Sequence, residues 1–95
     1  MIFLIDKVDS EYQVIVYEDI DQLIYSVEWL DIFAGKTLII DENGVEYKWD
    51  STKKDEIDTV YGYTIISTSR VSDLVTECLK RVNADKDICE FNFVL

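Results

Sequence analysis

The amino-acid sequence predicts a single α+β domain over residues 1–95, mainly an antiparallel sheet of five to six strands with two helices packed on it. Short runs rich in β-branched and aromatic residues recur along the chain, an Asn-Gly pair lies between two of them, and two segments repeat apolar residues at helical spacing. The 95 residues, 48% of them hydrophobic, suffice for one compact core and leave no room for a second domain.

The first two predicted strands are Ile2 to Ile5 and Tyr12 to Tyr17. Asp9-Ser10 lies between them and supplies the residue types of a turn, so the two runs are predicted to form a hairpin. The second run carries apolar side chains on both of its faces. We therefore expect this strand to be covered on both sides, or nearly so.

A short helix is predicted from Asp19 to Val27, because Asp19 is a good N-cap, Gln22 follows three residues later, and apolar residues then recur at helical spacing. Glu28 to Phe33 fits either a continuation of this helix or a short strand, and its Trp, Ile and Phe favour the strand or a bend. Gly35 ends either version.

The organising element is predicted to be a hairpin within Thr37 to Trp49, folded back through Asn43-Gly44. Asn-Gly favours a tight turn with positive φ at both central residues, whose twist matches that of the strands. We expect the other elements to pack on or beside this hairpin, since an isolated hairpin is only marginally stable in water.

The remaining strands are separated by one long polar loop, Asp50 to Asp58. Thr59 to Thr68 resumes the strand pattern, and Gly62 within it indicates a bulge or a close approach of another backbone. A last strand, Ile88 to Val94, is predicted to close the domain.

The clearest helical pattern extends from Ser69 to Val82. Ser69 is the expected N-cap, and Lys80-Arg81 near the end suits the helix dipole. Asn83 can adopt the left-handed conformation that stops a helix, so we expect the helix to end there.

The charge of the chain restricts its partners. Twenty acidic and nine basic residues give a formal net charge of −11, and there is no histidine. Such a surface repels nucleic acid and anionic lipid and attracts a basic protein, which predicts a protein partner and neither a nucleic acid nor a membrane. The alternative interpretation is that the acidity serves solubility alone.

Localisation is predicted to be cytoplasmic. The apolar start, Met1 to Ile5, has no basic flank and no cleavage site, so it is not a secretory signal, and no run approaches the ~20 apolar residues of a membrane span. The two cysteines, Cys78 and Cys89, do not make a disulfide framework, and reduced, buried thiols are expected.

The absence of histidine excludes Ser-His-Asp and Cys-His catalysis and the common zinc and non-haem iron ligand sets. Asp41-Glu42-Asn43-Gly44 lacks the spacing of a calcium loop and is interpreted as a turn. A carboxylate pair of the glycosidase kind stays open in principle. We predict no enzyme activity, no catalytic residue, no cofactor and no metal.

Acidic residues gather in groups along the chain. Glu18, Asp19 and Asp21 lie at the start of the first helix, and further acids follow in the two segments that flank the central hairpin. They could form one negative face, or an ordinary solvated surface. Tyrosine and tryptophan, which anchor protein interfaces, lie among them. The predicted partner contacts are Glu28, Trp29, Asp31, Trp49, Asp55, Glu56 and Asp58.

The runs Val-Glu-Trp-Leu-Asp-Ile-Phe-Ala-Gly-Lys from Val27 and Ile-Ile-Asp-Glu-Asn-Gly-Val-Glu-Tyr from Ile39 resemble a module of small bacterial proteins, some of them immunity-type proteins encoded beside toxins. The resemblance extends over Val27 to Trp49. It implies a cytosolic antidote that binds and blocks a polymorphic or contact-dependent toxin domain. It transfers no site residues, because such proteins vary at their binding surfaces.

The first hypothesis is thus an immunity protein that neutralises a basic toxin domain, such as a nuclease with a cationic cleft. One alternative is an inhibitor from a mobile element that mimics the charge of nucleic acid. Another is a structural or oligomerisation domain, in which exposed strand edges pair two chains into a homodimer.

Overall fold

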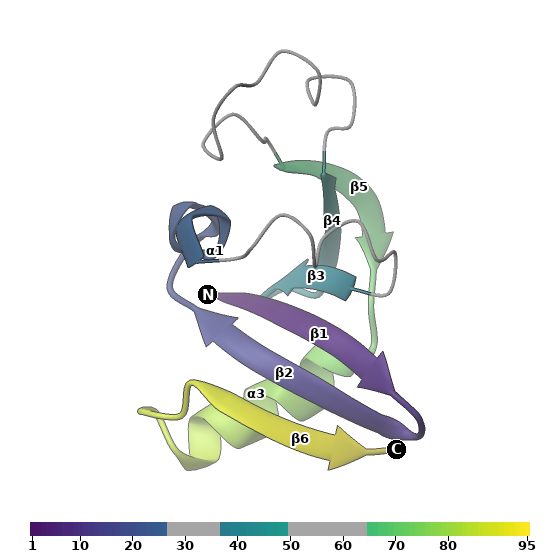
Figure 1. The fold of residues 1–95 in the computed structure, drawn as a ribbon, viewed down its shortest axis with the longest axis vertical. Coiled ribbons are helices and arrows are strands. Elements are labelled where there is room, and N and C mark those ends of the chain that lie inside the picture. The colour runs from purple at the N-terminus through teal and green to yellow at the C-terminus, as the bar shows by residue number, and fades with distance from the viewer. Residues whose placement is uncertain (27–36, 50–64) are drawn as a thin grey trace.

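The computed structural model describes residues 1–26, 37–49 and 65–95, which form one sheet and two helices (Figure 1). The strands are β1 (Ile2–Val8), β2 (Glu11–Tyr17), β3 (Thr37–Asp41), β4 (Val45–Trp49), β5 (Ile65–Val71) and β6 (Glu90–Val94), and the helices are α1 (Ile20–Ser26) and α3 (Leu74–Ala84). The predicted α+β class, a mainly antiparallel sheet of five to six strands with two helices, is confirmed.

The six strands lie in the order β5-β4-β3-β1-β2-β6, and every neighbouring pair is antiparallel. β1 is central and pairs with β2 on one side and β3 on the other. The prediction that the β3–β4 hairpin organises the chain is therefore wrong. Residues Ile2 to Ile5 of β1 are all buried, and a strand that is apolar on both faces needs cover on both, which α3 supplies on one face and α1 on the other.

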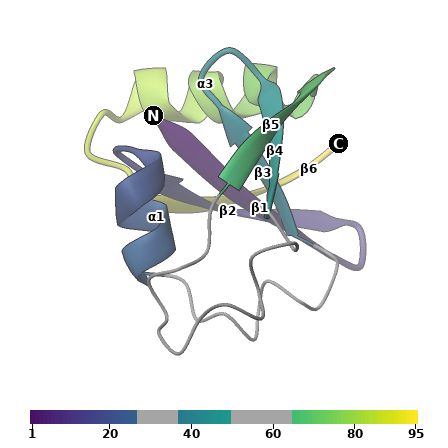
Figure 2. The same ribbon diagram turned by 90° about the horizontal axis from the view of Figure 1, so that it is seen from above.

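The two helices cover opposite faces of this sheet (Figure 2). Phe3 and Ile5 face α3 and share a core with its Cys78 and Val82. On the other face, Ile2 and Leu4 pack with Ile39 of β3 and with Leu23 of α1, which is fully buried; these contacts form a second, smaller core.

The expectation that β2 is covered on both faces is only half right. Val14 is buried on the α3 side, but Ile15, on the other side, is 40% exposed. α1 is only seven residues long and follows directly after the end of β2, so it covers the part of this face around Ile2 and Leu4. Within the described residues, the rest of the α1 face of β2 stays open.

The turn between β3 and β4 differs from the prediction. Ile39 pairs with Tyr47, which leaves three residues in the loop, and only Gly44 among them has a positive φ, of 83°. The N–H of Gly44 donates to the carbonyl of Asp41 (2.9 Å), so a β-turn is followed by a left-handed glycine. The expected two-residue turn with positive φ at both central positions is wrong, because the strand register leaves one residue more.

The boundary between β5 and α3 also differs. Residues from Ser69 to Val71 belong to the strand, since Val71 pairs with Val45, and the helix begins at Leu74 after Asp73 as N-cap. Ser69 was the expected N-cap; it instead has a φ of 66° within an irregular part of β5.

At its other end α3 continues past Asn83 to Ala84, and Asp85, in an extended conformation, is the C-cap. The predicted stop at Asn83 is wrong. The polypeptide turns after Asp85, whose carbonyl and carboxylate accept hydrogen bonds from the N–H groups of Ile88 and Asp87 (both 3.1 Å).

Several predictions lie outside the described residues. These are the strand or bend at Glu28 to Phe33, the loop at Asp50 to Asp58, and the first part of the strand at Thr59 to Thr68, with Gly62. The first hairpin and the last strand are confirmed as β1–β2 and β6.

Candidate functional site

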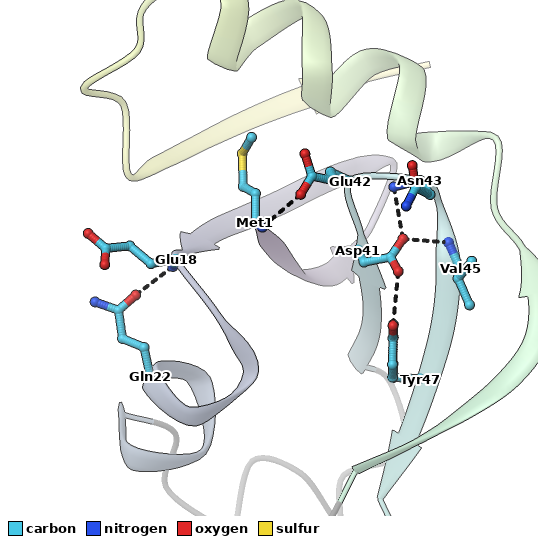
Figure 3. Close-up of polar contacts among 8 residues, drawn as sticks. All are labelled: Met1, Glu18, Gln22, Asp41, Glu42, Asn43, Val45 and Tyr47. Carbon is cyan, nitrogen blue, oxygen red and sulfur yellow. Dashed lines mark hydrogen bonds and ion pairs between the residues drawn. The ribbon is translucent and has the colours of Figure 1, made fainter.

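One end of the sheet brings together acidic residues that are far apart in the sequence. Ile2 pairs with Tyr17 of β2 and with Asp41 of β3, so the ends of these two strands flank the start of β1. The residues that follow them, Glu18 and Glu42, consequently lie on either side of Met1 (Figure 3). We call this group the acidic end: Glu18, Asp19, Asp21, Asp41 and Glu42.

The first side of the acidic end is the start of α1. The N–H of Gln22 donates to the Asp19 carboxylate (2.8 Å), and the side-chain oxygen of Gln22 accepts from the N–H of Glu18 (2.6 Å; Figure 3). The first bond confirms the predicted Asp19 cap, and the second differs from a capping box because Gln22 accepts from the residue before the cap rather than from the cap itself. They hold Glu18 and Asp21 beside the first turn of the helix, where negative charge also suits the dipole.

The second side is the β3–β4 turn, which Asp41 organises. Its carboxylate accepts hydrogen bonds from the N–H groups of Asn43 (2.8 Å) and Val45 (3.0 Å) and from the hydroxyl of Tyr47 (2.9 Å; Figure 3). Asp41 in turn raises the pKa of the Tyr47 hydroxyl, because the hydrogen bond and the nearby negative charge both favour the protonated form. Glu42, beside it, is exposed and lies 3.3 Å from the amino group of Met1.

Two open hollows adjoin at this end. All five residues of the acidic end line the acidic hollow, of about 400 Å³, together with the start of β1. The adjoining hollow, of about 570 Å³, shares Met1 and Glu18 with it and lies between β2 and the end of α3. Its lining includes apolar Val16, Val82 and Ile88 as well as the cation of Lys86.

The chemistry available here is electrostatic attraction and apolar packing. Five acidic residues line the acidic hollow, while the positive groups among the residues that line the two hollows are the Met1 amino group and Lys86. A cationic side chain entering the acidic hollow would meet several opposite charges at once. Over the described parts of the chain, no group of three or more His, Cys, Asp or Glu side chains is arranged to hold a metal ion.

The two thiols differ in their surroundings. Cys78 lies on the face of α3 that is buried in the core. Burial raises the pKa of its thiol to about 12, so the thiol stays protonated and inert. Cys89 is exposed and lies in the lining of the adjoining hollow. Both are free thiols; the prediction that they are buried is confirmed for Cys78 and wrong for Cys89.

Most of the predicted contact residues fall outside the described residues: Glu28, Trp29, Asp31, Asp55, Glu56 and Asp58. Trp49 is the last residue of β4. Of the acidic groups noted in the sequence, the structure brings Glu18, Asp19 and Asp21 together at the acidic end.

Asp41 and Glu42 were missed, because they were interpreted only as turn residues. No local pattern reveals them as part of a site. Their place next to Glu18 follows from two strand pairings, Ile2 with Tyr17 and Ile2 with Asp41, which only the folded sheet defines.

In comparisons with protein-family models, with curated proteins and with solved structures, nothing matches this chain. The resemblance to immunity-type proteins therefore stays a prediction. Neither helix in the described part of the chain has the length and apolar character that a membrane crossing requires.

Proposed function

We propose that this protein is a cytoplasmic immunity protein that binds a basic toxin domain and neutralises it. The observation that supports this best is the acidic end, where five acidic residues, from the start of α1 and from the end of β3 with its turn, line one open hollow. We assign the protein no catalytic residue, no cofactor and no metal.

Charge supports this proposal in two ways. The net charge of −11 speeds the encounter with a cationic protein and rejects acidic ones. The acidic end then provides a local site at which Lys and Arg side chains of the toxin are neutralised, as a nuclease with a cationic cleft would require.

The adjoining hollow supports a protein partner rather than a diffuse ion atmosphere. Its apolar lining residues, Val16, Val82 and Ile88, can receive an apolar or aromatic side chain next to the acidic contacts. An apolar anchor surrounded by charged contacts is the usual anatomy of a protein interface.

The test is binding to the toxin domain encoded by the neighbouring gene, measured by calorimetry at several salt concentrations. The double variant Glu18→Lys, Asp21→Lys should weaken binding at least about tenfold and lower its salt dependence. Glu11→Lys with Asp87→Lys changes the net charge equally at residues that line neither hollow, and should have a smaller effect.

The second candidate surface, Asp55, Glu56 and Asp58, is tested by charge reversal in the same assay. If this reversal weakens binding and the Glu18, Asp21 variant does not, contact lies there and not at the acidic end. If no basic toxin domain binds, or neither reversal changes affinity and salt dependence, the proposed function is wrong.

A further inference from the structure

The two edges of the sheet differ in how they are protected. Among the described strands, β5 and β6 each have a neighbour on one side only. The pairing of β5 with β4 contains a register shift, and Ser69 within β5 has a φ of 66°, so this edge is irregular. β6 pairs with β2 in continuous register and contains no Lys, Arg or Pro. It is short and carries Glu90, but it lacks the bulge, the proline and the lysine that most directly prevent an edge strand from pairing further.

The backbone of β6 presents hydrogen-bonding groups at its free edge. The N–H of Val16 donates to the carbonyl of Cys89 (2.8 Å), so the backbone groups of Cys89 point to β2. Because these groups alternate along an antiparallel strand, those of Phe91 and Phe93 also point to β2, and those of Glu90, Asn92 and Val94 point outward.

The sequence of β6 complements itself about Asn92. If a second β6 lies antiparallel with Asn92 opposite Asn92, then Phe91 lies opposite Phe93 and Glu90 opposite Val94. No like charges oppose each other, although each chain carries −11. The two phenylalanines already lie on the α3 face, where Phe93 stacks on Tyr12 with ring centroids 5.2 Å apart. The second copy would continue this aromatic row.

The same register also places an exposed apolar side chain. Continued by one residue, this pairing brings Leu95 of the second copy opposite Cys89. Cys89 lines the adjoining hollow together with Val82 of α3, and the alternation of side chains along the strand would place Leu95 on this same face. Leu95 is 74% exposed and Val94 64% exposed in the single chain. Cys89 lines the adjoining hollow, so Leu95 of the second copy would lie at the rim of that hollow.

We propose that two copies of this chain form a twofold symmetric dimer by antiparallel pairing of their β6 edges, centred on Asn92. The outward N–H and C=O groups of Glu90, Asn92 and Val94 satisfy those of the second copy, and the two sheets become one. The acidic ends lie at opposite ends of the dimer. This inference does not depend on the proposed function.

The first experiment is analytical ultracentrifugation of the whole chain over a range of concentrations and salt. A dimer is expected, and salt should strengthen it because it screens the repulsion between two acidic chains. Binding to a basic toxin should instead weaken with salt, so failure of one proposal is distinguishable from failure of the other.

Asn92→Pro should weaken the dimer roughly ten- to a hundredfold. The substitution removes one outward N–H donor from each chain, so the symmetric dimer loses two hydrogen bonds. The bonds between β6 and β2 do not use this N–H, so circular dichroism should show an intact fold. Asn92→Ala keeps the N–H and should remain dimeric.

Engineered disulfides test the register independently of stability. Leu95→Cys places a thiol opposite Cys89 of the second copy at a non-hydrogen-bonded pair, where Cα atoms are about 4.5 Å apart, which a disulfide can span. Oxidation should give a covalent dimer on a non-reducing gel. The side chain at position 94 points to the opposite face of the sheet, so the Val94→Cys variant should give far less covalent dimer.

Either of two results would overturn the dimer. One is a monomer at every concentration and salt tested. The other is a dimer that Asn92→Pro leaves intact and that cross-links equally through Val94→Cys and Leu95→Cys, since this would place the contact elsewhere.

Discussion

At the scale of single residues, Asp41 contributes most to the local structure of the candidate site. One carboxylate accepts three hydrogen bonds, two from backbone N–H groups of the turn and one from Tyr47. Hydrogen bonds to a charged acceptor contribute more than neutral ones, and two of these three are partly buried. The acidic end thus depends on a residue whose charge also maintains the turn.

Asp41→Ala should lower the free energy of unfolding by about 2 to 3 kcal/mol, because three donors lose their acceptor. Urea denaturation measures this change. Glu42→Ala is the matched control: the Glu42 carboxylate is exposed and pairs with the Met1 amino group, so its loss should cost less than about 0.5 kcal/mol. Equal effects of the two substitutions would contradict the assigned role of Asp41.

The two thiols should react differently in the folded protein. Near pH 8, a thiol reagent should modify one cysteine per chain, Cys89, because Cys78 is fully buried and its pKa is raised to about 12. In denaturant, the reagent should also modify the second thiol, that of Cys78. The Cys89→Ser variant should show no reactive thiol until it unfolds. Rapid labelling of folded Cys89→Ser would show that Cys78 is accessible.

At the scale of elements, the β3–β4 turn packs against the start of α3. The N–H of Ser72 donates to the carbonyl of Gly44 (2.8 Å), and a Cβ on Gly44 would lie 2.9 Å from both the Ser72 carbonyl oxygen and Cγ1 of Val75. Gly44 therefore meets two requirements, a positive φ and a close approach of another backbone. The turn joins one part of the sheet to the helix that covers its larger core.

Gly44→Ala should destabilise the protein by about 2 to 4 kcal/mol, from left-handed strain together with overpacking against Ser72 and Val75. Thermal or urea unfolding measures it. Asp9→Gly serves as a control, since Asp9 also has a positive φ (56°) but is exposed; this change should stay within about 1 kcal/mol. A Gly44→Ala variant as stable as the parent would disprove the close contact.

At the scale of the whole molecule, ionisable groups with raised pKa values set its response to alkali. Burial raises the pKa of Tyr17 above its ordinary 10.0, the Asp41 hydrogen bond raises that of Tyr47, and Cys78 rises from 9.0 to about 12. In each case the folded chain holds a proton that the unfolded chain releases at lower pH. The unfolded state binds fewer protons, so stability falls as pH rises.

The free energy of unfolding should thus be constant up to about pH 8 and decrease from about pH 9 upward, first through Cys78 and then through the two tyrosines. Urea midpoints measured across this range test the prediction. In Cys78→Ala, which is less stable overall, the decrease should start nearer pH 10, the ordinary pKa of a tyrosine. An unchanged midpoint up to pH 11 would contradict the role of these groups.

Local signals in the sequence predicted some parts of the fold well. Asp19 caps α1 through a hydrogen bond from the N–H of Gln22, three residues later, and a β-branched run needs only its own pattern to favour a strand. The predicted boundary of a helix was wrong where a local preference competed with the pairing of distant strands. Ser69 is a good N-cap, yet the pairing of Val71 with Val45, a residue 26 positions earlier, extended the strand past it.

The sequence by itself determined the antiparallel α+β class, the residues of the two hairpins, the capped start of α1 and the strong negative charge, because spacing, turn chemistry and composition are local properties. Three features emerge only on folding: β1 lies at the centre, Glu18 and Glu42 lie on either side of Met1, and β6 is a regular edge among the described strands. These depend on which strands pair, and pairing is chosen by the burial of apolar faces across the whole chain.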